Sequence, residues 1–382
     1  MTLALPEEVC RAAEGRRVPD ADAGAVYGAD LQELSRAAEA ARIASKGRRV
    51  TFSKKAFFNA VNLCRDTCTY CSYKSGPADP GLSMMGLDDV SGLARLARGC
   101  GCVEALLVTG ERPEERYAEA RRWLRGMGFS STAEYLVHAS EAALAEGLFP
   151  HTNAGAMDEG QIRELRGSNV SMGLMLESSS ARLGGGGMPH ELAPSKEPGA
   201  RIGALEAAGR CKMPITTGVL AGIGETPSEM VESLLEIRRL HERFGNIQEV
   251  IVQNFRPGEA TPMRGEPPAG APYLARIVCT ARLLMPAMNI QVPPNLLPGS
   301  YMGMVGMVND WGGVSPLTPD HVNPGFAWPD IAGLESECAG AGYDLACRFP
   351  VYPEFMGMVP ARLREMMDEV GEGGLVAGWR WR

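Results

Sequence analysis

The sequence predicts an α/β fold of the (β/α)8 TIM-barrel type, in which the barrel of parallel strands is closed or partly open. Two observations predict this fold. Short apolar runs alternate with helical stretches over residues 51–330, and strands that alternate with helices pair into parallel sheets. About eight such runs are present, which is the number of strands in such a barrel. Barrels of this type often occupy a chain of this length as one unit.

Before the barrel, residues 1–50 form a segment rich in Ala and Arg with a helical pattern, and the clearest helix covers 29–45. Each expected barrel strand is a short apolar run that ends in polar or turn-forming residues. The expected strands cover 56–63, 103–110, 148–155, 170–178, 214–225, 249–255, 289–295 and 311–317. The expected helices between them cover 87–99, 112–126, 131–147, 158–167, 200–210 and 226–245.

The helix over 226–245 has the strongest boundary signals. Thr226 and Glu229 have the spacing of a capping box, Pro227 falls at the first helical position, and Gly245 follows the last turn. Residues 181–200 form the most loop-like insertion, with four consecutive glycines at 184–187 that favour a flexible loop over a phosphate-binding loop. The last segment, 331–382, is expected to be a helical C-terminal extension.

Composition excludes several classes of protein. The net charge of −8 argues against a general nucleic-acid or anionic-membrane surface. No apolar run reaches the roughly 18 residues that span a bilayer, and the first ten residues lack the pattern of a signal peptide. Ten cysteines in a chain of this length do not resemble a disulfide scaffold. We therefore expect a cytoplasmic protein that binds neither nucleic acid nor membrane.

Three of the cysteines, Cys64, Cys68 and Cys71, form a C-x3-C-x2-C motif with Tyr70 before the last one. Structural zinc sites fill four positions, typically with paired C-x2-C knuckles, and here no second knuckle follows and the first histidine is His138. Iron–sulfur clusters also use cysteine thiolates, usually four per cubane, so three would leave one iron open. The motif follows an expected strand, and barrel enzymes place their chemistry at that end.

Other interpretations of the cysteines stay open at this stage. Cys68 and Cys71 have the spacing of a redox C-x-x-C pair, although such a pair is expected to open a helix. A non-catalytic iron–sulfur carrier or sensor would need the same ligands. A second cluster built from other cysteines is less favoured than buried free thiols; the cysteines concerned are Cys100, Cys102, Cys338 and Cys347.

The tri-cysteine motif with its preceding aromatic residue resembles the signature of the radical S-adenosylmethionine (SAM) superfamily. This resemblance implies that Cys64, Cys68 and Cys71 bind a [4Fe-4S] cluster and that the open iron binds the amino and carboxyl groups of SAM. It also implies that Tyr70 packs against the edge of the adenine.

Three further stretches resemble that superfamily in chain order. Residues 109–111 resemble its G-G-E motif, with Thr109 in place of the first glycine, and Glu177 resembles a ribose-binding carboxylate. Residues 218–225 resemble its G-x-I-x-G-x-x-E pattern, with Leu220 for isoleucine. The alternatives are a plain strand-to-helix turn at 109–111, a solvated loop acid for Glu177 and an exposed helical residue for Arg201. The SAM-binding residues that the resemblance implies are Thr109, Gly110, Glu111, Glu177, Arg201, Gly218, Leu220, Gly222 and Glu225.

A closer resemblance, over about residues 52–330, is to the deazaflavin synthase family and most narrowly to the subunit that closes the ring of 7,8-didemethyl-8-hydroxy-5-deazariboflavin (FO), the chromophore of the deazaflavin coenzyme factor 420. Loop 181–200 and the tail after about residue 345 depart from the pattern. The stretches that carry the resemblance are 149–157, 171–178, 216–226, 239–257, 289–296 and 309–324.

This resemblance implies a carbon–nitrogen lyase reaction. The substrate would be a 5-amino-5-(4-hydroxybenzyl)-6-(ribitylimino)-uracil adduct made by a sister enzyme, and the products would be FO, ammonia, 5′-deoxyadenosine and methionine. An electron donor such as flavodoxin or ferredoxin would be a partner. The alternatives are the sister synthase, which joins tyrosine to the ribityl-amino-uracil, and a menaquinone-type radical SAM enzyme. Because the chain has one tri-cysteine motif, the other reaction is expected on a separate protein.

Polar residues at the ends of later strands are candidates for binding this substrate, since a uracil and a ribityl chain need many hydrogen-bonding partners. His151 and Asn153 are the predicted catalytic residues. For each candidate, a structural or surface role is an equal alternative. The remaining candidates are Gln253, Asn254, Arg256, Asn295, Asp310 and His321.

Overall fold

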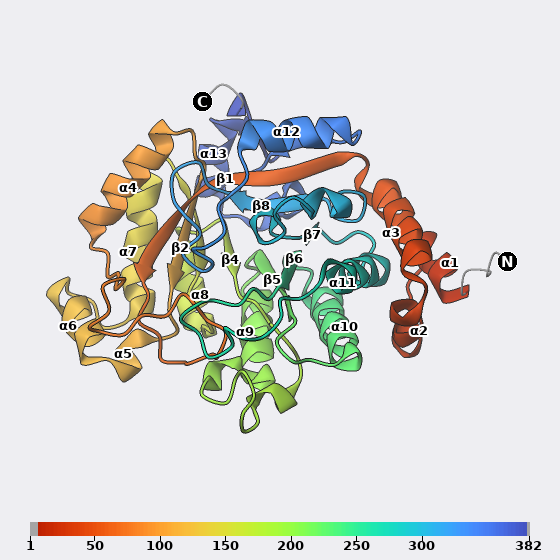
Figure 1. The fold of residues 1–382 in the computed structure, drawn as a ribbon. Helices are drawn as coiled ribbons and strands as arrows, with labels where there is room; N and C mark the ends of the chain where they lie inside the picture. The colour runs from red at the N-terminus through yellow and green to blue at the C-terminus, as the bar shows by residue number, and fades with distance from the viewer. Residues whose placement is uncertain (1–6, 380–382) are drawn as a thin grey trace.

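Eight parallel strands form a closed barrel at the centre of the molecule (Figure 1). In the computed structural model, which describes residues 7–379, neighbouring strands follow the order β2-β3-β4-β5-β6-β7-β8-β1, and pairing of β1 with β2 closes the ring. The TIM-barrel prediction is confirmed, and the barrel is closed rather than partly open. The strands are β1 (Arg49–Val61), β2 (Glu104–Thr109), β3 (Phe149–Asn153), β4 (Ser171–Gly173), β5 (Ile215–Ala221), β6 (Ile247–Asn254), β7 (Ile290–Gln291) and β8 (Asp310–Val314).

Helices surround the barrel and follow the strands in alternation (Figure 1). The predicted helix over 112–126 is broken in two because Tyr117 adopts an extended backbone conformation. The capping box is confirmed, since the Glu229 N–H donates to Thr226 Oγ1 (3.3 Å) and the Thr226 N–H donates to Glu229 Oε2 (2.7 Å). These helices are α4 (Leu87–Gly99), α5 (Pro113–Arg116), α6 (Ala118–Gly126), α7 (Thr132–Ala145), α8 (Glu159–Arg166), α9 (Pro198–Arg210), α10 (Pro227–Phe244) and α11 (Ala271–Leu284).

The loops between these elements contain four short 3-10 helices. They are η2 (Ala181–Gly184), η3 (Pro194–Lys196), η4 (Pro294–Leu296) and η5 (Tyr301–Met304). Among residues 7–379 no helix is both long and apolar enough to cross a bilayer.

The N-terminal segment is helical, as its pattern predicts, and packs beside α11 (Figure 1). The buried guanidinium of Arg42 attaches it to the barrel by donating to the carbonyl oxygens of Val308 (3.0 Å) and Arg49 (2.9 Å). The segment consists of α1 (Glu7–Ala13), η1 (Asp20–Asp22), α2 (Ala23–Gly28) and α3 (Leu31–Lys46).

The C-terminal segment is not purely helical as expected, because it also contributes a strand to the main sheet. β1 is 13 residues long. Its second half pairs with β2, and its first four residues, 49–52, are left free to pair in parallel with β9. The segment consists of α12 (Ile331–Gly340), β9 (Asp344–Cys347), η6 (Pro353–Met358), α13 (Ala361–Asp368), β10 (Gly371–Glu372) and β11 (Leu375–Val376).

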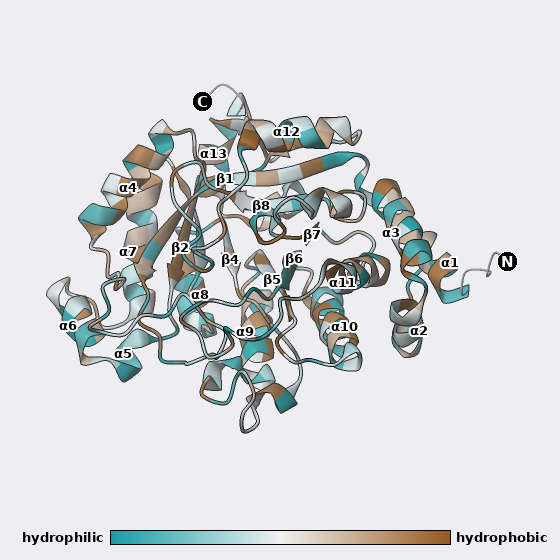
Figure 2. Ribbon diagram, viewed as in Figure 1, coloured by the Kyte–Doolittle hydropathy of each residue, from teal (hydrophilic) through white to brown (hydrophobic). Residues whose placement is uncertain are grey.

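The main core lies between the barrel strands and the surrounding helices. Figure 2 shows β2 as hydrophobic along most of its length, whereas outer helices such as α3 and α6 carry hydrophilic residues. Burial on both faces explains why the strands read as continuous apolar runs. The polar side chains inside the barrel are therefore exceptions, and they mark the two cavities described below.

Candidate active site

The tri-cysteine loop begins directly after β1, at the carboxyl-terminal mouth of the barrel. Cys64, Cys68 and Cys71 line one cavity of about 230 Å³, here called the cysteine cavity, and all three thiols are free. The N–H of Glu111 donates to Cys64 Sγ (3.2 Å). Burial raises the pKa of Cys64 to about 11 and that of Cys68 to about 12, so that iron, rather than solvent, would have to stabilise the thiolates.

This donor set fits a cluster better than a single ion. Among residues 7–379, no three His, Cys, Asp or Glu side chains are close enough together to bind one metal ion. In a cubane each cysteine binds a different iron, which requires three separated thiols facing one space.

The turn after β2 packs its backbone against the cysteine loop. The N–H of Gly110 donates to the Val61 carbonyl (2.7 Å). A Cβ on Gly110 would lie 2.0 Å from the Leu63 carbonyl oxygen and 2.7 Å from Cys64 Cβ. The close approach explains why the sequence has glycine at this position, as in the G-G-E motif that it resembles.

Glu111 and Arg201 line the cysteine cavity beside each other. The Glu111 carboxylate accepts the N–H of Ala156 (3.1 Å) and lies 3.9 Å from an Arg201 terminal nitrogen. Gly155 adopts φ +79°, and a Cβ there would lie 2.0 Å from Glu111 Oε2. Glu111 therefore joins the loops that follow β2 and β3, and it holds Arg201 at the cavity wall.

Glu177 also lines the cysteine cavity, and its backbone is left-handed, with φ +65°. Such a conformation costs about 1–3 kcal/mol in a non-glycine residue and persists where the surroundings fix it. The N–H of Glu177 donates to the Gly218 carbonyl (3.0 Å), and Lys196 Nζ lies 2.5 Å from its carboxylate. Burial is the largest single influence and would raise the pKa of Glu177, but the charge and hydrogen bond of Lys196, together with the charge of Arg201, hold that pKa below its usual value.

Loop 181–200 covers the cysteine loop, and its role was missed by the sequence analysis. The N–H of Thr67 donates to the Leu192 carbonyl (2.7 Å), and that of Thr69 donates to the Pro189 carbonyl (3.1 Å). Tyr70 is hydrogen-bonded to His190 Nε2 (3.0 Å). Tyr70 also packs with Leu220 from β5, which forms an apolar face of the cavity beside the cysteines.

Three residues of the glycine-rich β5 pattern do not line this cavity. A Cβ on Gly218 would lie 2.1 Å from the Ile251 carbonyl oxygen, so that glycine allows β5 and β6 to approach. Gly222 adopts φ +96° in the following turn. Glu225 accepts the N–H groups of Gly222 (2.8 Å) and Ile223 (2.9 Å) and thereby fixes the turn. These three residues shape the strand and the turn that follows it, and of this pattern Leu220 lines the cavity, while the contacts of the pattern with SAM stay a prediction.

Several polar atoms around the cysteine cavity are buried without a hydrogen-bond partner among the described residues. Buried polar groups are normally paired, so such a group of open donors and acceptors indicates a polar ligand. The chemistry fits SAM, which offers a carboxylate, an ammonium and ribose hydroxyls. The open atoms are Asp66 Oδ1, Thr109 Oγ1, Arg201 Nε, Asn254 Oδ1 and Arg256 Nε.

A second cavity of about 170 Å³, here called the lumen cavity, lies inside the barrel. Asn153, Met175 and Gln253 line both cavities, so the two spaces adjoin. His151 and Asn295 also line the lumen cavity. The structure therefore brings both predicted catalytic residues to the space next to the cysteines, although their roles stay predictions.

His151 is a neutral hydrogen-bond acceptor toward the lumen. Its Nδ1 lies 2.7 Å from Ser171 Oγ, and the Ser171 hydroxyl donates to the Pro350 carbonyl. Because the single hydroxyl proton is used there, Nδ1 carries the imidazole proton and Nε2 is left as an acceptor. Burial lowers the pKa of His151 to about 4, so the ring is uncharged near neutral pH.

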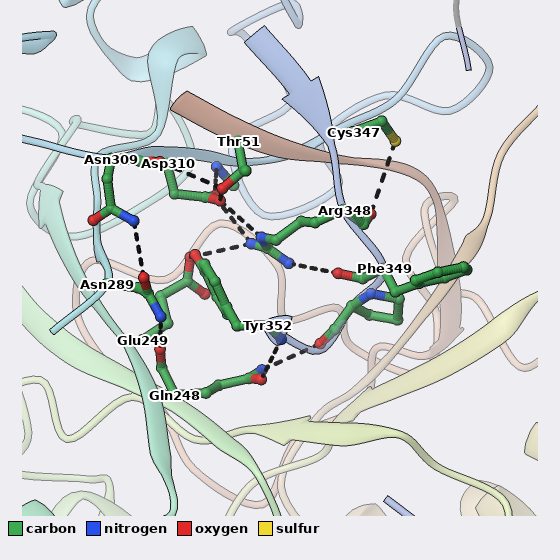
Figure 3. Close-up of polar contacts among 12 residues, drawn as sticks. Thr51, Gln248, Glu249, Asn289, Asn309, Asp310, Cys347, Arg348, Phe349 and Tyr352 are labelled. Carbon is green, nitrogen blue, oxygen red and sulfur yellow. Dashed lines mark hydrogen bonds and ion pairs between the residues drawn. The ribbon is translucent and has the colours of Figure 1, made fainter. Parts of the chain in front are cut away.

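Two of the predicted substrate-binding residues, Asp310 and His321, do not line either cavity. His321 packs against the ring of Phe57, with the ring centres 5.1 Å apart. Asp310 is fully buried and paired with Arg348, whose Nε lies 2.7 Å from Asp310 Oδ2 (Figure 3). The sequence analysis placed Asp310 in the substrate pocket because it did not anticipate a cation from the C-terminal tail.

Arg348 closes the floor of the barrel together with Tyr352 from the same tail (Figure 3). The guanidinium also lies 3.2 Å from Glu249 Oε1, and the Tyr352 hydroxyl donates to that oxygen (2.6 Å). Burial raises the pKa of Glu249 to about 7, with Arg348 acting in the opposite direction. The tail thus supplies the base of the lumen cavity, which Arg348 and Pro350 line.

Comparison with known proteins identifies the family, although no protein-family model matches the chain. The chain is 42% identical over 327 residues to a 7,8-didemethyl-8-hydroxy-5-deazariboflavin synthase of Methanopyrus kandleri, covering 85% of this chain and 98% of that protein. It is 42% identical over 345 residues to the FO synthase of Streptomyces avermitilis and 41% identical over 359 residues to that of Mycobacterium tuberculosis. Those matches cover 86% and 91% of this chain, but only 40% and 41% of the longer proteins.

Solved structures support the fold. The FeFe-hydrogenase maturase HydG from Carboxydothermus hydrogenoformans superposes with a TM-score of 0.74 at 17% identity, over 95% of this chain and 88% of that one. Methylornithine synthase superposes with a TM-score of 0.70 at 18% identity, over 89% and 97%. The 42% identity to the Methanopyrus kandleri protein over most of both chains, with the tri-cysteine loop at the mouth of a closed barrel, shows that the chain belongs to the FO synthase family of radical SAM enzymes, which act in deazaflavin biosynthesis.

Proposed function

We propose that this chain catalyses the ring-closing half of FO synthesis. Its substrate is the 4-hydroxybenzyl adduct of ribitylimino-uracil, and the reaction joins the two rings and releases ammonia. The observation that carries the proposal is the pair of adjoining cavities, one lined by the three cysteines and the other lined by polar groups inside the barrel. The sequence resemblance to ring-closing subunits supports this half-reaction over the joining of tyrosine to the uracil.

The proposal assigns the cysteine cavity to the cofactors. Cys64, Cys68 and Cys71 would hold a [4Fe-4S] cluster, and Glu177 and Arg201, which line the same cavity, would bind SAM. Together the two cofactors supply abstraction of a hydrogen atom from the substrate. The chain contributes position, because Lys196 orients Glu177 and the Glu111 carboxylate lies beside Arg201.

The lumen cavity holds the substrate on the far side of Asn153 and Gln253 from the cysteines. The neutral His151 accepts a hydrogen bond there through Nε2, and the closed floor excludes water from below. The adduct comes from a sister synthase, and electrons come from a donor such as flavodoxin or ferredoxin.

The direct test is anaerobic incubation of the cluster-loaded protein with SAM, a reductant and the purified adduct. We expect FO fluorescence together with ammonia and 5′-deoxyadenosine. Cys71→Ala should abolish all three signals, whereas Cys211→Ala is the matched control because Cys211 lies at the end of α9, outside both cavities.

The alternative half-reaction gives a different result in the same assay. If the protein consumed tyrosine and ribityl-amino-uracil, and left the preformed adduct unchanged, it would be the joining synthase and the proposal would be wrong.

A further inference from the structure

Lys55 and Glu104 are two buried charges that line the lumen cavity and attract each other, but among the described residues no hydrogen bond or close ion pair joins them. They lie opposite each other on β1 and β2, where their Cα atoms are register partners. Lys55 is 8% exposed and Glu104 is 6% exposed, and both line the cavity. Within residues 7–379, neither the ammonium nor the carboxylate has a side-chain hydrogen bond or an ion pair.

The surroundings hold the Lys55 side chain in place. A Cβ on Gly313 of β8 would lie 2.2 Å from Lys55 Cδ and 2.8 Å from its Nζ, so that glycine makes room for the lysine. The Nζ lies 4.4 Å from the centre of the Trp328 ring and 5.9 Å from that of Phe57. These rings stabilise the cation, but they leave its N–H groups free to donate.

Burial of such groups without hydrogen bonds costs free energy, and a ligand that pairs with both would offset that cost. The two unit charges are opposite in sign, so this pair favours an uncharged group of the ligand. The ligand must present a hydrogen-bond acceptor to Lys55 and a donor to Glu104, because a lysine only donates and a carboxylate only accepts.

We propose that Lys55 and Glu104 bind the substrate through a neutral group in which a hydrogen-bond acceptor lies beside a donor. This inference rests on the proposed function, since the substrate class there offers such a group in two places. The imide edge of the uracil has a carbonyl beside an N–H, and the ribityl chain has adjacent hydroxyls. Both sources share the chemistry that the site recognises.

The test measures binding of the product FO to the cluster-loaded protein by anaerobic equilibrium dialysis, with free FO read by fluorescence. We expect Lys55→Met and Glu104→Gln each to weaken FO binding about tenfold or more, which is the effect of leaving one buried partner unpaired. The double variant Lys55→Met/Glu104→Gln should bind as weakly as either single variant.

The double variant also separates binding from folding, since it leaves no unpaired charge in the barrel and should melt close to the wild type. The matched control is Lys46→Met/Glu354→Gln, which removes a Lys–Glu pair outside both cavities and should leave FO binding unchanged. If the double variant at the cavity bound FO like this control, the inference would be overturned.

Two analogues distinguish the sources of the recognised group. The first analogue is FO methylated at the imide nitrogen, which lacks the imide N–H. The second is a deazaflavin with methyl in place of ribityl, which lacks the hydroxyls. The analogue that lacks the recognised group should bind the wild type weakly. Its affinity should not fall further when Glu104 is replaced by Gln. If both analogues bound the wild type as tightly as FO does, the proposed recognition would be wrong.

Turnover of the adduct by the wild type is measured in parallel. If the wild type releases ammonia but the variants bind FO as tightly as the wild type does, only this inference is contradicted. If FO binding depends on Lys55 but the wild type releases no ammonia from the adduct, only the proposed function is contradicted.

Discussion

Gly110 packs so tightly against the cysteine loop that no side chain fits between them. Its added Cβ would lie 2.0 Å from the Leu63 carbonyl oxygen, which is part of the backbone and cannot turn aside. We expect Gly110→Ala to displace the loop around Cys64 and to lower the iron bound after anaerobic reconstitution at least several-fold, as measured by iron and sulfide analysis.

Gly92→Ala is the matched control for that substitution. Gly92 lies within α4 with no atom within 4 Å of an added Cβ. Alanine there should keep full iron content and stabilise the helix by about 0.5–1 kcal/mol. Equal iron content in the two variants would contradict the view that the turn after β2 positions the cysteines.

Single residues also show where sequence reasoning ends. Cys64, Cys68 and Cys71 were predictable because their spacing is local and rare. Lys196 was not, because it pairs with Glu177 only after loop 181–200 folds over the mouth of the barrel. Lys55 carried a weak signal, since a lysine inside an apolar strand must either reach water or face a polar interior. Its register with Glu104 became visible only in the barrel.

At the scale of elements, strand β9 brings Arg348 into the barrel floor. Replacing Arg348 by Met would leave Asp310 and Glu249 without their buried cation, and removal of one partner from a buried ion pair costs about 3–5 kcal/mol. We expect Arg348→Met to lower the free energy of unfolding in urea by about that amount. Arg348→Met/Asp310→Asn should recover part of the loss, because one unpaired charge is removed.

Arg362→Met is the control, because it changes the same tail but leaves the contacts of Arg348 at the barrel floor intact. Arg362 pairs with Glu141 on the surface, where its side chain is 60% exposed. Exposed pairs contribute about 0–1 kcal/mol. If Arg362→Met lowered the free energy of unfolding as much as Arg348→Met does, the loss would come from any change in the tail and not from the buried pair.

The elements themselves were largely predictable. All eight strands and the helices named from the sequence were found, with 112–126 divided into α5 and α6, because apolar runs and caps are local signals. The lengths were less predictable. The run 170–178 yields only three residues of strand, since Glu177 turns into a left-handed conformation. The tail was expected to be helical because β9 has four residues and depends on pairing with β1.

At the scale of the whole molecule, the two ends of the barrel have different roles. Loops at the carboxyl ends of the strands carry the cysteines, as in other barrels of this class. The amino ends are closed by Arg348 and Tyr352, which the tail supplies (Figure 3). The long strand β1 connects the two ends, since it pairs with β2, β8 and β9 and leads directly into the cysteine loop.

This connection predicts that the tail and the barrel unfold together. Phe52 of β1 packs against Trp379 near the end of the tail, with ring centres 5.2 Å apart, and Arg348 is 4% exposed inside the barrel. Detaching the tail would therefore expose buried charge and apolar surface. In native-state hydrogen exchange read by mass spectrometry, we expect peptides from β9 and β1 to share one free energy of opening. If β9 exchanged at a much lower free energy than β1, the tail would be a separable unit, and Arg348→Met should then leave exchange in β1 unchanged.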